Sequence, residues 1–357
     1  MANVQKQIEQ YDDKIRLTRF DENAVLVRRR DAVLEKLRAQ FDAKRKEGKK
    51  PPTFQPFNQG SYQMATGIDP DEGDYDIDVG LEFNATTSDY PNPVDLKELV
   101  YEALKDHTPL GTSVRRSCVT VKYQVDGEQA YHVDLAVYAC NHLAASPREL
   151  SLAKGKLHSA PAHRSWERSD PKGLTAWVET KFSDAEQQRQ FLRIIRCLKG
   201  WKSYRFSHEG NSAPPGIGLT IAAGHLLSPV VHVNPVSKKV TCDDRLAMRG
   251  LVDKMIAGFR LTPSSERAGT LVERLAVMLP VVPATDVMAR MTDAQMADFR
   301  LKLVALRDVL DVVGMEIDPV EACKKMVDQF GARFPVPSKE ETGQTRGPAI
   351  ISSGSSA

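Results

Sequence analysis

The chain has 357 residues, of which 41% are hydrophobic and 27% charged, so it is long enough for two packed lobes. Basic residues outnumber acidic ones by only 49 − 47 = 2, which argues against a long nucleic-acid polymer as partner. Five scattered cysteines without a Cys-x-x-Cys pair predict neither a disulfide framework nor a zinc site. The polar N-terminus and the lack of any apolar run of ~18–20 residues predict a soluble, cytoplasmic protein with no membrane contact.

The first segment, residues 3–47, is helix-rich and predicts one long helix. Val27, Leu34, Leu37 and Phe41 give it an apolar stripe. Gly48 followed by two prolines ends the pattern.

Two different chemistries lie side by side in residues 60–78. Gly60-Ser61 predicts a small turn whose backbone N–H groups can cradle a phosphate. Asp76 and Asp78 stand two positions apart, so in a strand both carboxylates point to one face. Carboxylates this close repel each other unless a cation intervenes, and a hard divalent ion is the usual solution. The alternative interpretation is an acidic surface turn.

A third carboxylate occupies a later strand. The pattern predicts a helix at about 94–107, then strands on both sides of the Asp126-Gly127 turn signal. Around Asp134 the residues alternate, with Val133, Leu135 and Val137 on one face and Asp134 on the other. An aspartate on such a strand must be paired, liganded or solvated, so a solvent-facing position is the alternative.

The second half is predicted to be mostly helical. Residues 141–170 appear loop-rich, and Ser169-Asp170-Pro171 predicts the start of a helix that carries Trp177. Helices dominate residues 184–332, including apolar stripes at 271–279 and 299–310 that we assign to the core. From Pro335 the small, polar composition predicts a disordered tail.

A basic helix is predicted at residues 191–202. Phe191, Ile194, Ile195, Leu198 and Trp201 form its apolar stripe, and another face carries the basic side chains at three-residue steps, Arg196, Lys199 and Lys202. The alternative is an ordinary amphipathic helix with a solvated basic face.

The order G-S-x-x-x-x-T, then D-x-D on a strand, then a single D on a later strand resembles the DNA polymerase β-like nucleotidyltransferases. The run Tyr-Asp-Ile-Asp-Val-Gly-Leu at 75–81 looks like one subgroup, the bacterial cGAS/DncV-like enzymes (CD-NTases) of CBASS antiviral defence, which make cyclic-oligonucleotide signals. The resemblance covers roughly residues 25–330 and implies a bilobal α+β fold with a mixed catalytic sheet, an N-terminal spine helix and a helical C-terminal lobe. We therefore expect a catalytic core at 1–183, a helical lobe at 184–334 and the tail at 335–357.

The resemblance also implies roles for single residues. Asp76 and Asp78 would ligate two Mg²⁺ (or Mn²⁺) ions, and Asp134 would ligate the catalytic ion and help to activate the attacking 3′-hydroxyl. The remaining implied contacts are with the nucleotide. Gly60 and Ser61 would hold the donor triphosphate, and a lysine of the basic helix would contact its phosphates, with Lys202 the first choice and Lys199 the second. Thr220 or Ser212 would contact phosphate or sugar, and a base would be contacted by Tyr138, Tyr204 and Arg205.

Three hypotheses about function follow. The leading one is synthesis of a cyclic di- or trinucleotide, adenine-containing, from ATP and other NTPs. The alternative is a linear nucleotidyltransferase that acts on RNA or protein, as some toxins do, and the third is an inactive nucleotide-binding scaffold. The resemblance further implies an effector that reads the product, and either a ubiquitin-transfer-like enzyme that conjugates Ala357 or a HORMA-type regulator. Base choice, ring size and linkage stay open, and so do the activating signal and the oligomeric state.

Overall fold

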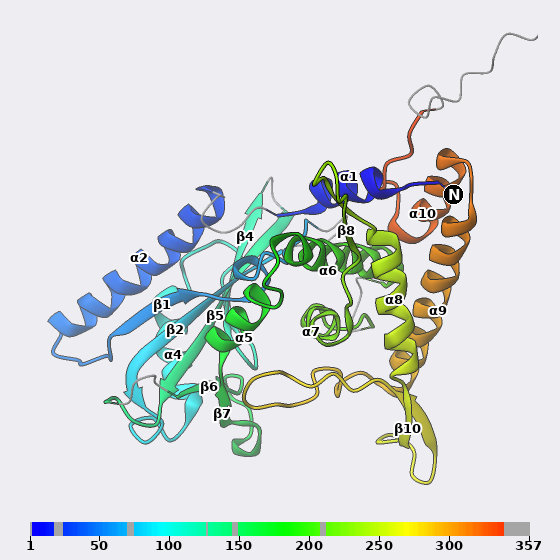
Figure 1. The fold of residues 1–357 in the computed structure, drawn as a ribbon. Helices are drawn as coiled ribbons and strands as arrows, with labels where there is room; N and C mark the ends of the chain where they lie inside the picture. The colour runs from blue at the N-terminus through cyan, green and yellow to red at the C-terminus, as the bar shows by residue number, and fades with distance from the viewer. Residues whose placement is uncertain are drawn as a thin grey trace, which may run out of the picture.

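One half of the protein is a mixed seven-stranded sheet (Figure 1). The computed structural model describes residues 2–17, 24–69, 75–125, 128–144, 149–207 and 212–338. The strands run in the order β1-β2-β5-β4-β3, β6 continues from β5, and β7 pairs with β6. Their bounds are β1 Phe54–Asn58, β2 Tyr75–Thr86, β3 Thr112–Val114, β4 Val119–Val125, β5 Glu128–Cys140, β6 Leu150–Lys154 and β7 Ser165–Ser169. Among the strand pairs that the structure describes in this sheet, the central pair, β2 and β5, is parallel and the others are antiparallel.

The two faces of this sheet differ in chemistry because side chains alternate along each strand. Val133, Leu135 and Val137 are fully buried, as the alternating pattern predicts, and share a core with Val79 and Leu81 of β2. Two helices supply the rest of that core, α2 (Ala24–Lys46) and α4 (Pro93–Leu104). The opposite face carries the polar residues of β2 and β5.

The other half is a helical lobe with its own core (Figure 1). Its helices are α1 Gln5–Ile15, α6 Ala185–Arg205, α7 Gly216–Leu226, α8 Asp244–Ala257, α9 Asp293–Met315 and α10 Pro319–Phe330. Two hairpins project from it, formed by β8 Val231–Val233 with β9 Val240–Cys242 and by β10 Arg260–Pro263 with β11 Leu271–Arg274. The remaining helical elements are α3 (Gly60–Gln63), the 3₁₀ turn Pro161–His163 between β6 and β7, and α5 (Pro171–Glu179).

Helix α1 packs with the helical lobe although it comes first in the chain. Val4, Ile8, Tyr11 and Ile15 are buried in the core that α6 and α10 also form. The helix-rich segment at 3–47 therefore consists of two helices rather than one: α1 ends at Ile15, and α2 is a separate helix behind the sheet. The domain boundaries at 183 and 334 stay a prediction.

Several predicted elements are confirmed. The helix expected at about 94–107 is α4, whose N-cap Asn92 accepts a hydrogen bond from the Val94 N–H. The helix after Ser169 is α5, capped by Asp170 with Pro171 in its first turn. The stripe at 299–310 lies on α9. The α+β bilobal architecture as a whole agrees with the expectation.

Two expectations are wrong. Residues 141–170 contain the strand pair β6 and β7, and residues 271–279 are not helical. Leu271, Leu275 and Leu279 have helical spacing, but β11 pairs with β10 instead, and Pro280 disfavours helical backbone at Leu279. Leu275 is buried as extended chain rather than as a helical face.

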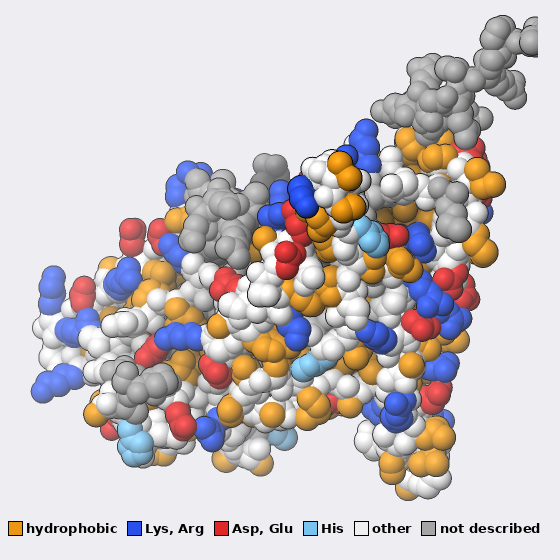
Figure 2. All heavy atoms as spheres, in the orientation of Figure 1, with side chains coloured by type: hydrophobic (Ala, Val, Ile, Leu, Met, Phe, Trp, Pro, Cys, Tyr) orange, Lys and Arg blue, Asp and Glu red, His pale blue; other side chains and the backbone are white. Residues whose placement is uncertain are grey.

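The surface seen in Figure 2 mixes basic and acidic side chains over both halves. None of the described helices combines the length and the apolarity that crossing a bilayer requires. The turn residues Asp126 and Gly127, and the tail from 339 to Ala357, lie outside the described residues.

Candidate active site

The register of β2 and β5 brings two predicted carboxylates together. Asp78 lies directly opposite Asp134, and Asp76 lies opposite His132. Paired residues of parallel strands share a face, and neighbouring strands are about 4.8 Å apart, so Asp78 and Asp134 are side by side. The backbone of Asp76 belongs to the same strand, but its side chain lies outside the described residues.

Gly60 lies directly against Asp78. Its φ is +76°, and a Cβ at this position would lie 2.0 Å from Asp78 Oδ2. A side chain here would therefore displace the carboxylate, in addition to the cost of the left-handed backbone. The predicted Gly60-Ser61 turn is the start of the one-turn helix α3, and Ser61 lines the same cavity as Asp78.

Asp134 is held mainly from β4. Thr120 Oγ1 donates a hydrogen bond to Asp134 Oδ1 at 2.6 Å, and His132 Nε2 lies 3.8 Å from Asp134 Oδ2. The Asp134 side chain is 15% exposed. It is therefore not a solvent-facing strand residue.

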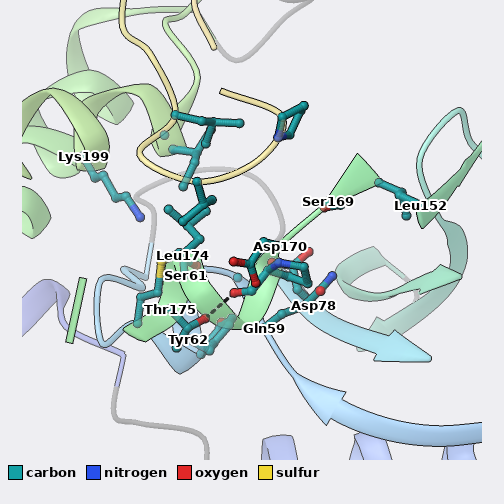
Figure 3. A pocket seen from close by; sticks show the side chains of 18 of the residues that line it. Gln59, Ser61, Tyr62, Asp78, Leu152, Ser169, Asp170, Leu174, Thr175 and Lys199 are labelled. Carbon is teal, nitrogen blue, oxygen red and sulfur yellow. Dashed lines mark hydrogen bonds between the residues drawn. The ribbon is translucent and has the colours of Figure 1, made fainter. Parts of the chain in front are cut away.

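A cavity of about 700 Å³ opens beside Asp78 (Figure 3). Its walls come from both halves: α3 and β2, the strands β6 and β7, the start of α5, helix α6, and the loop segment 279–283. In Figure 3 Asp78, Gln59 and Ser61 lie on the sheet side, and Lys199 reaches down from α6 across the cavity. Tyr138 also lines it and donates a hydrogen bond to Gln59 Oε1 at 2.9 Å.

Helix α6 supplies the basic wall. Lys199 and Lys202 both line the cavity, as the three-residue spacing predicts. Lys199 Nζ donates to the Thr66 carbonyl at 2.9 Å and to Thr66 Oγ1 at 3.1 Å. Burial, and secondarily the charge of Lys202, lower the pKa of Lys199 to about 7. The alternative of a solvated basic face does not hold for Lys199, which is 9% exposed.

Arg196, the third basic residue of the series, has a structural role. Its guanidinium forms a buried bidentate pair with Asp12 of α1, at 2.6 and 2.7 Å, and donates to the Ala65 carbonyl at 2.7 Å. Arg196 and Lys199 thus hold consecutive carbonyls, those of Ala65 and Thr66, which follow α3. The cationic face of α6 is positioned against the sheet half by these contacts.

Other predicted contacts lie elsewhere. Thr220 is fully buried, donates to the Gly216 carbonyl within α7 and does not line the cavity, so its assignment to a nucleotide contact is corrected. Ser212 donates to the Ser207 carbonyl and is also outside the lining. Tyr204 is 47% exposed and packs near Gly331, and Arg205 donates to the Asp328 carbonyl. Neither Tyr204 nor Arg205 lines the cavity.

Sequence reasoning missed the far end of the cavity. Lys154 of β6 and Glu167 of β7 line it, with Lys154 Nζ 3.6 Å from Glu167 Oε1 and 3.1 Å from Ser117 Oγ. The residues 141–170 carried no signal beyond a short alternation at 150–154. The cavity therefore has two lysines at its α6 wall and a mixed-charge pair at its β6–β7 wall.

The donor set fits a hard divalent cation. Asp78 and Asp134 are carboxylates on adjacent strands, and oxygen ligands of this kind are what Mg²⁺ and Mn²⁺ prefer. Among the side chains that the structure describes, no three His, Cys, Asp or Glu groups form a metal-binding set. Asp76, the neighbour of Asp78 on the same face of β2, is the residue that would complete one.

Comparisons with known proteins agree with this geometry. Residues 52–138 match the family model described as "Cyclic GMP-AMP synthase DncV-like, nucleotidyltransferase domain". A curated cyclic GMP-AMP synthase of Escherichia albertii is 24% identical over 172 residues, which are 46% of this chain and 35% of the relative. The matched part thus spans about a third of that relative's length.

Solved structures resemble the chain over nearly its whole length. The Vibrio cholerae DncV cyclic AMP-GMP synthase gives a TM-score of 0.69 at 18% identity, covering 95% of this chain and 98% of that one. The same enzyme with nonhydrolyzable GTP gives 0.65 at 18% identity and the same coverage. Its complex with the linear intermediate 5′ pppA(3′,5′)pG gives 0.63 at 18% identity, covering 95% and 97%. The protein has the DncV fold, and its residues 52–138, which carry Gly60, Asp78 and Asp134, match the DncV-like nucleotidyltransferase domain.

Proposed function

We propose that this protein is a metal-dependent nucleotidyltransferase that joins NTPs into a cyclic oligonucleotide, the signal of an antiviral CBASS system. One observation carries the proposal: Asp78 lines a cavity whose facing wall holds Lys199 and Lys202, and Asp134 lies beside Asp78 on the adjacent strand. A carboxylate pair at one wall and cations at the facing wall suit the transfer of a nucleotidyl group, which needs stabilisation of phosphate charge at both sides.

Asp76, Asp78 and Asp134 would hold Mg²⁺ or Mn²⁺. When bound, such ions polarise the phosphate and stabilise the charge of the attacking and leaving oxygens.

The protein's own residues bind and orient the nucleotides. Ser61 and the two lysines of α6 lie on opposite sides of the cavity, so a triphosphate between them receives charge-assisted contacts from Lys199 and Lys202. Asp134 Oδ1 already accepts from Thr120, so its other oxygen, Oδ2, is the atom that accepts the proton of an attacking 3′-hydroxyl. The triphosphate is disfavoured near Glu167, so the base end of a nucleotide lies toward β6 and β7.

The cavity allows two steps in one site. At about 700 Å³ it lies within the range of specific small-molecule sites. A first transfer gives a linear intermediate and pyrophosphate, and a second transfer in the same site closes the ring. The Vibrio cholerae relative was solved with a nonhydrolyzable GTP and with a linear pppA(3′,5′)pG intermediate, so ATP and GTP are the first substrates to try.

The test incubates the purified protein with the four NTPs and Mg²⁺ and identifies the products by mass. We expect a phosphatase-resistant cyclic product, and its ring size separates a dinucleotide from the adenine-containing trinucleotide that the sequence resemblance also allows. Asp78→Asn should give none. A phosphatase-sensitive linear product, or label transferred to RNA or protein, would favour the linear alternative, and no metal-dependent product at all would favour a scaffold.

The partners implied by the family stay predictions. They are an effector that reads the product and either a HORMA-type regulator or an enzyme that conjugates Ala357. Mass spectrometry of the protein co-expressed with a ubiquitin-transfer-like enzyme would reveal an adduct that disappears when residues 336–357 are deleted.

A further inference from the structure

Thr120 is the direct cross-strand partner of Asp134. The two residues are opposite each other in the antiparallel β4–β5 register, and Thr120 is fully buried. Its Oγ1 lies 2.6 Å from Asp134 Oδ1, a short distance typical of a hydroxyl bonded to a charged oxygen. The resemblance that identifies the three carboxylates assigns no role to this threonine.

The direction of this hydrogen bond follows from the chemistry of the groups. An ionised carboxylate only accepts, so the single hydroxyl proton of Thr120 is donated to Asp134. Cys118 Sγ lies 3.6 Å from the same hydroxyl oxygen, which has only lone pairs left to offer. Cys118 must therefore donate its S–H to Thr120.

The three side chains lie in a row, with Cys118 Sγ 3.6 Å from Thr120 Oγ1 and Thr120 Oγ1 2.6 Å from Asp134 Oδ1. Thr120 lies on β4 and Cys118 directly precedes this strand, so the adjacent strand fixes the orientation of the Asp134 carboxylate.

We propose that Thr120 is a positioning residue that holds the Asp134 carboxylate in the orientation required for divalent-ion binding, with Cys118 orienting the Thr120 hydroxyl. Occupying Oδ1 leaves Oδ2 for the ion and for the substrate proton. The inference rests on the proposed function, because it assumes that Asp134 is a metal ligand. Partners behind a metal ligand generally affect affinity about 10- to 100-fold.

The decisive variant is Thr120→Val, which keeps the side-chain shape and removes the hydroxyl. Mn²⁺ binding is measured directly by calorimetric titration, without turnover, and the Mg²⁺ concentration for half-maximal activity is measured separately. We expect Thr120→Val to weaken Mn²⁺ binding about 10-fold or more. Thr120→Ser, which keeps the donor, should stay within about 3-fold of wild type. Thr112→Val is the matched control: Thr112 lies on the neighbouring strand β3, and its hydroxyl donates to the Leu104 carbonyl at the end of α4.

Unchanged Mn²⁺ binding in Thr120→Val would overturn the inference. So would a Thr120→Ser variant that binds Mn²⁺ as weakly as Thr120→Val, because serine keeps the hydroxyl and lacks only the methyl group. If Thr120→Val does not fold, Cys118→Ala decides: it removes only the outer donor and should weaken Mn²⁺ binding a few-fold, whereas no change overturns the proposed chain. If the wild-type protein binds Mn²⁺ but transfers no nucleotide, the proposed function is refuted. The role of Thr120 is then still tested, because the Mn²⁺ titration does not depend on turnover.

Discussion

The two walls of the cavity are held in place by different means. On the sheet wall, Asp78 and Asp134 are aligned by the β2–β5 register, and Thr120 and Gly60 fix the surroundings of their carboxylates. On the α6 wall, Lys199 is positioned by tertiary contacts alone, through its bonds to Thr66 and through the neighbouring Arg196.

The two walls should therefore differ in how strongly they respond to mutations outside the cavity. Backbone pairing over many strand residues makes the acidic wall insensitive to the helical lobe. The basic wall depends on a few charged contacts between halves, so a change far from the cavity can move it. The following predictions test that contrast, from the largest expected effect to the smallest.

Replacing both acidic residues of β2, Asp76→Asn with Asp78→Asn, should reduce nucleotide incorporation at least about 10³-fold. The melting temperature should hold or rise, because two like charges are removed from one strand face. Glu82→Gln is the control: it lies on the same face but pairs with Lys172 outside the cavity, and it should retain turnover. Near-normal incorporation by the double variant would refute the acidic wall as the catalytic one.

Asp12→Ala should lower the free energy of unfolding by about 3–5 kcal/mol, since it leaves the buried Arg196 charge without its partner. Urea unfolding measures this, and triphosphate binding should weaken as α6 shifts. Glu321→Ala, which breaks an exposed pair with Lys324, should change stability by less than about 1 kcal/mol. Equal effects of the two variants would show that the Asp12–Arg196 contact does not support the basic wall.

Within the cavity, Lys202→Ala should weaken triphosphate binding by ~1.5–3 kcal/mol and Ser61→Ala by ~0.5–1.5 kcal/mol, because the lysine contact joins two opposite charges whereas the serine hydroxyl is neutral. Steady-state kinetics with varied NTP measures both. Arg205→Ala is the control on the same helix, since its guanidinium donates to the Asp328 carbonyl instead. A silent Lys202→Ala beside a strong Lys199→Ala effect would move the phosphate contact one turn along α6.

The remaining prediction concerns the pH dependence of stability. Lys199 has its pKa lowered to about 7 by burial, from an ordinary value of 10.5. Between these values the unfolded chain binds more protons at this site than the folded one, so stability rises with pH there. The difference in unfolding free energy between wild type and Lys199→Met should therefore grow in favour of wild type from about pH 7 to pH 10 and stay flat below. Parallel curves would show that Lys199 titrates normally.

Local patterns predicted the sheet wall well. The alternation around Asp134 and the Asp76/Asp78 spacing place side chains on a face because a strand has a period of two. The parallel pairing of Asp78 with Asp134 is not a local property, so the sequence alone supports it only through the family resemblance.

The β6–β7 wall was not predicted because short strands owe their structure to their neighbours more than to their own residues. Lys154 and Glu167 meet only when those strands pair. The misassigned Thr220 has a similar cause: α7 is surrounded by the helical lobe, so a polar residue there bonds within its own helix. Contacts such as Lys199 with Thr66 join residues 133 positions apart and leave no local signal.

The packing of α1 sets an order of events during synthesis. Asp12 and Arg196 are 184 positions apart, and the sheet lies between them in the chain. At about 5–20 residues per second a ribosome needs roughly 10–40 s to cover that distance. Throughout this interval α1 has been made but its partner helix has not, whereas the strands of the sheet can already pair. The nascent chain must therefore keep the apolar face of α1 from misassociating, and a helix translated before the sheet reaches its native contacts only after the sheet's strands have been made.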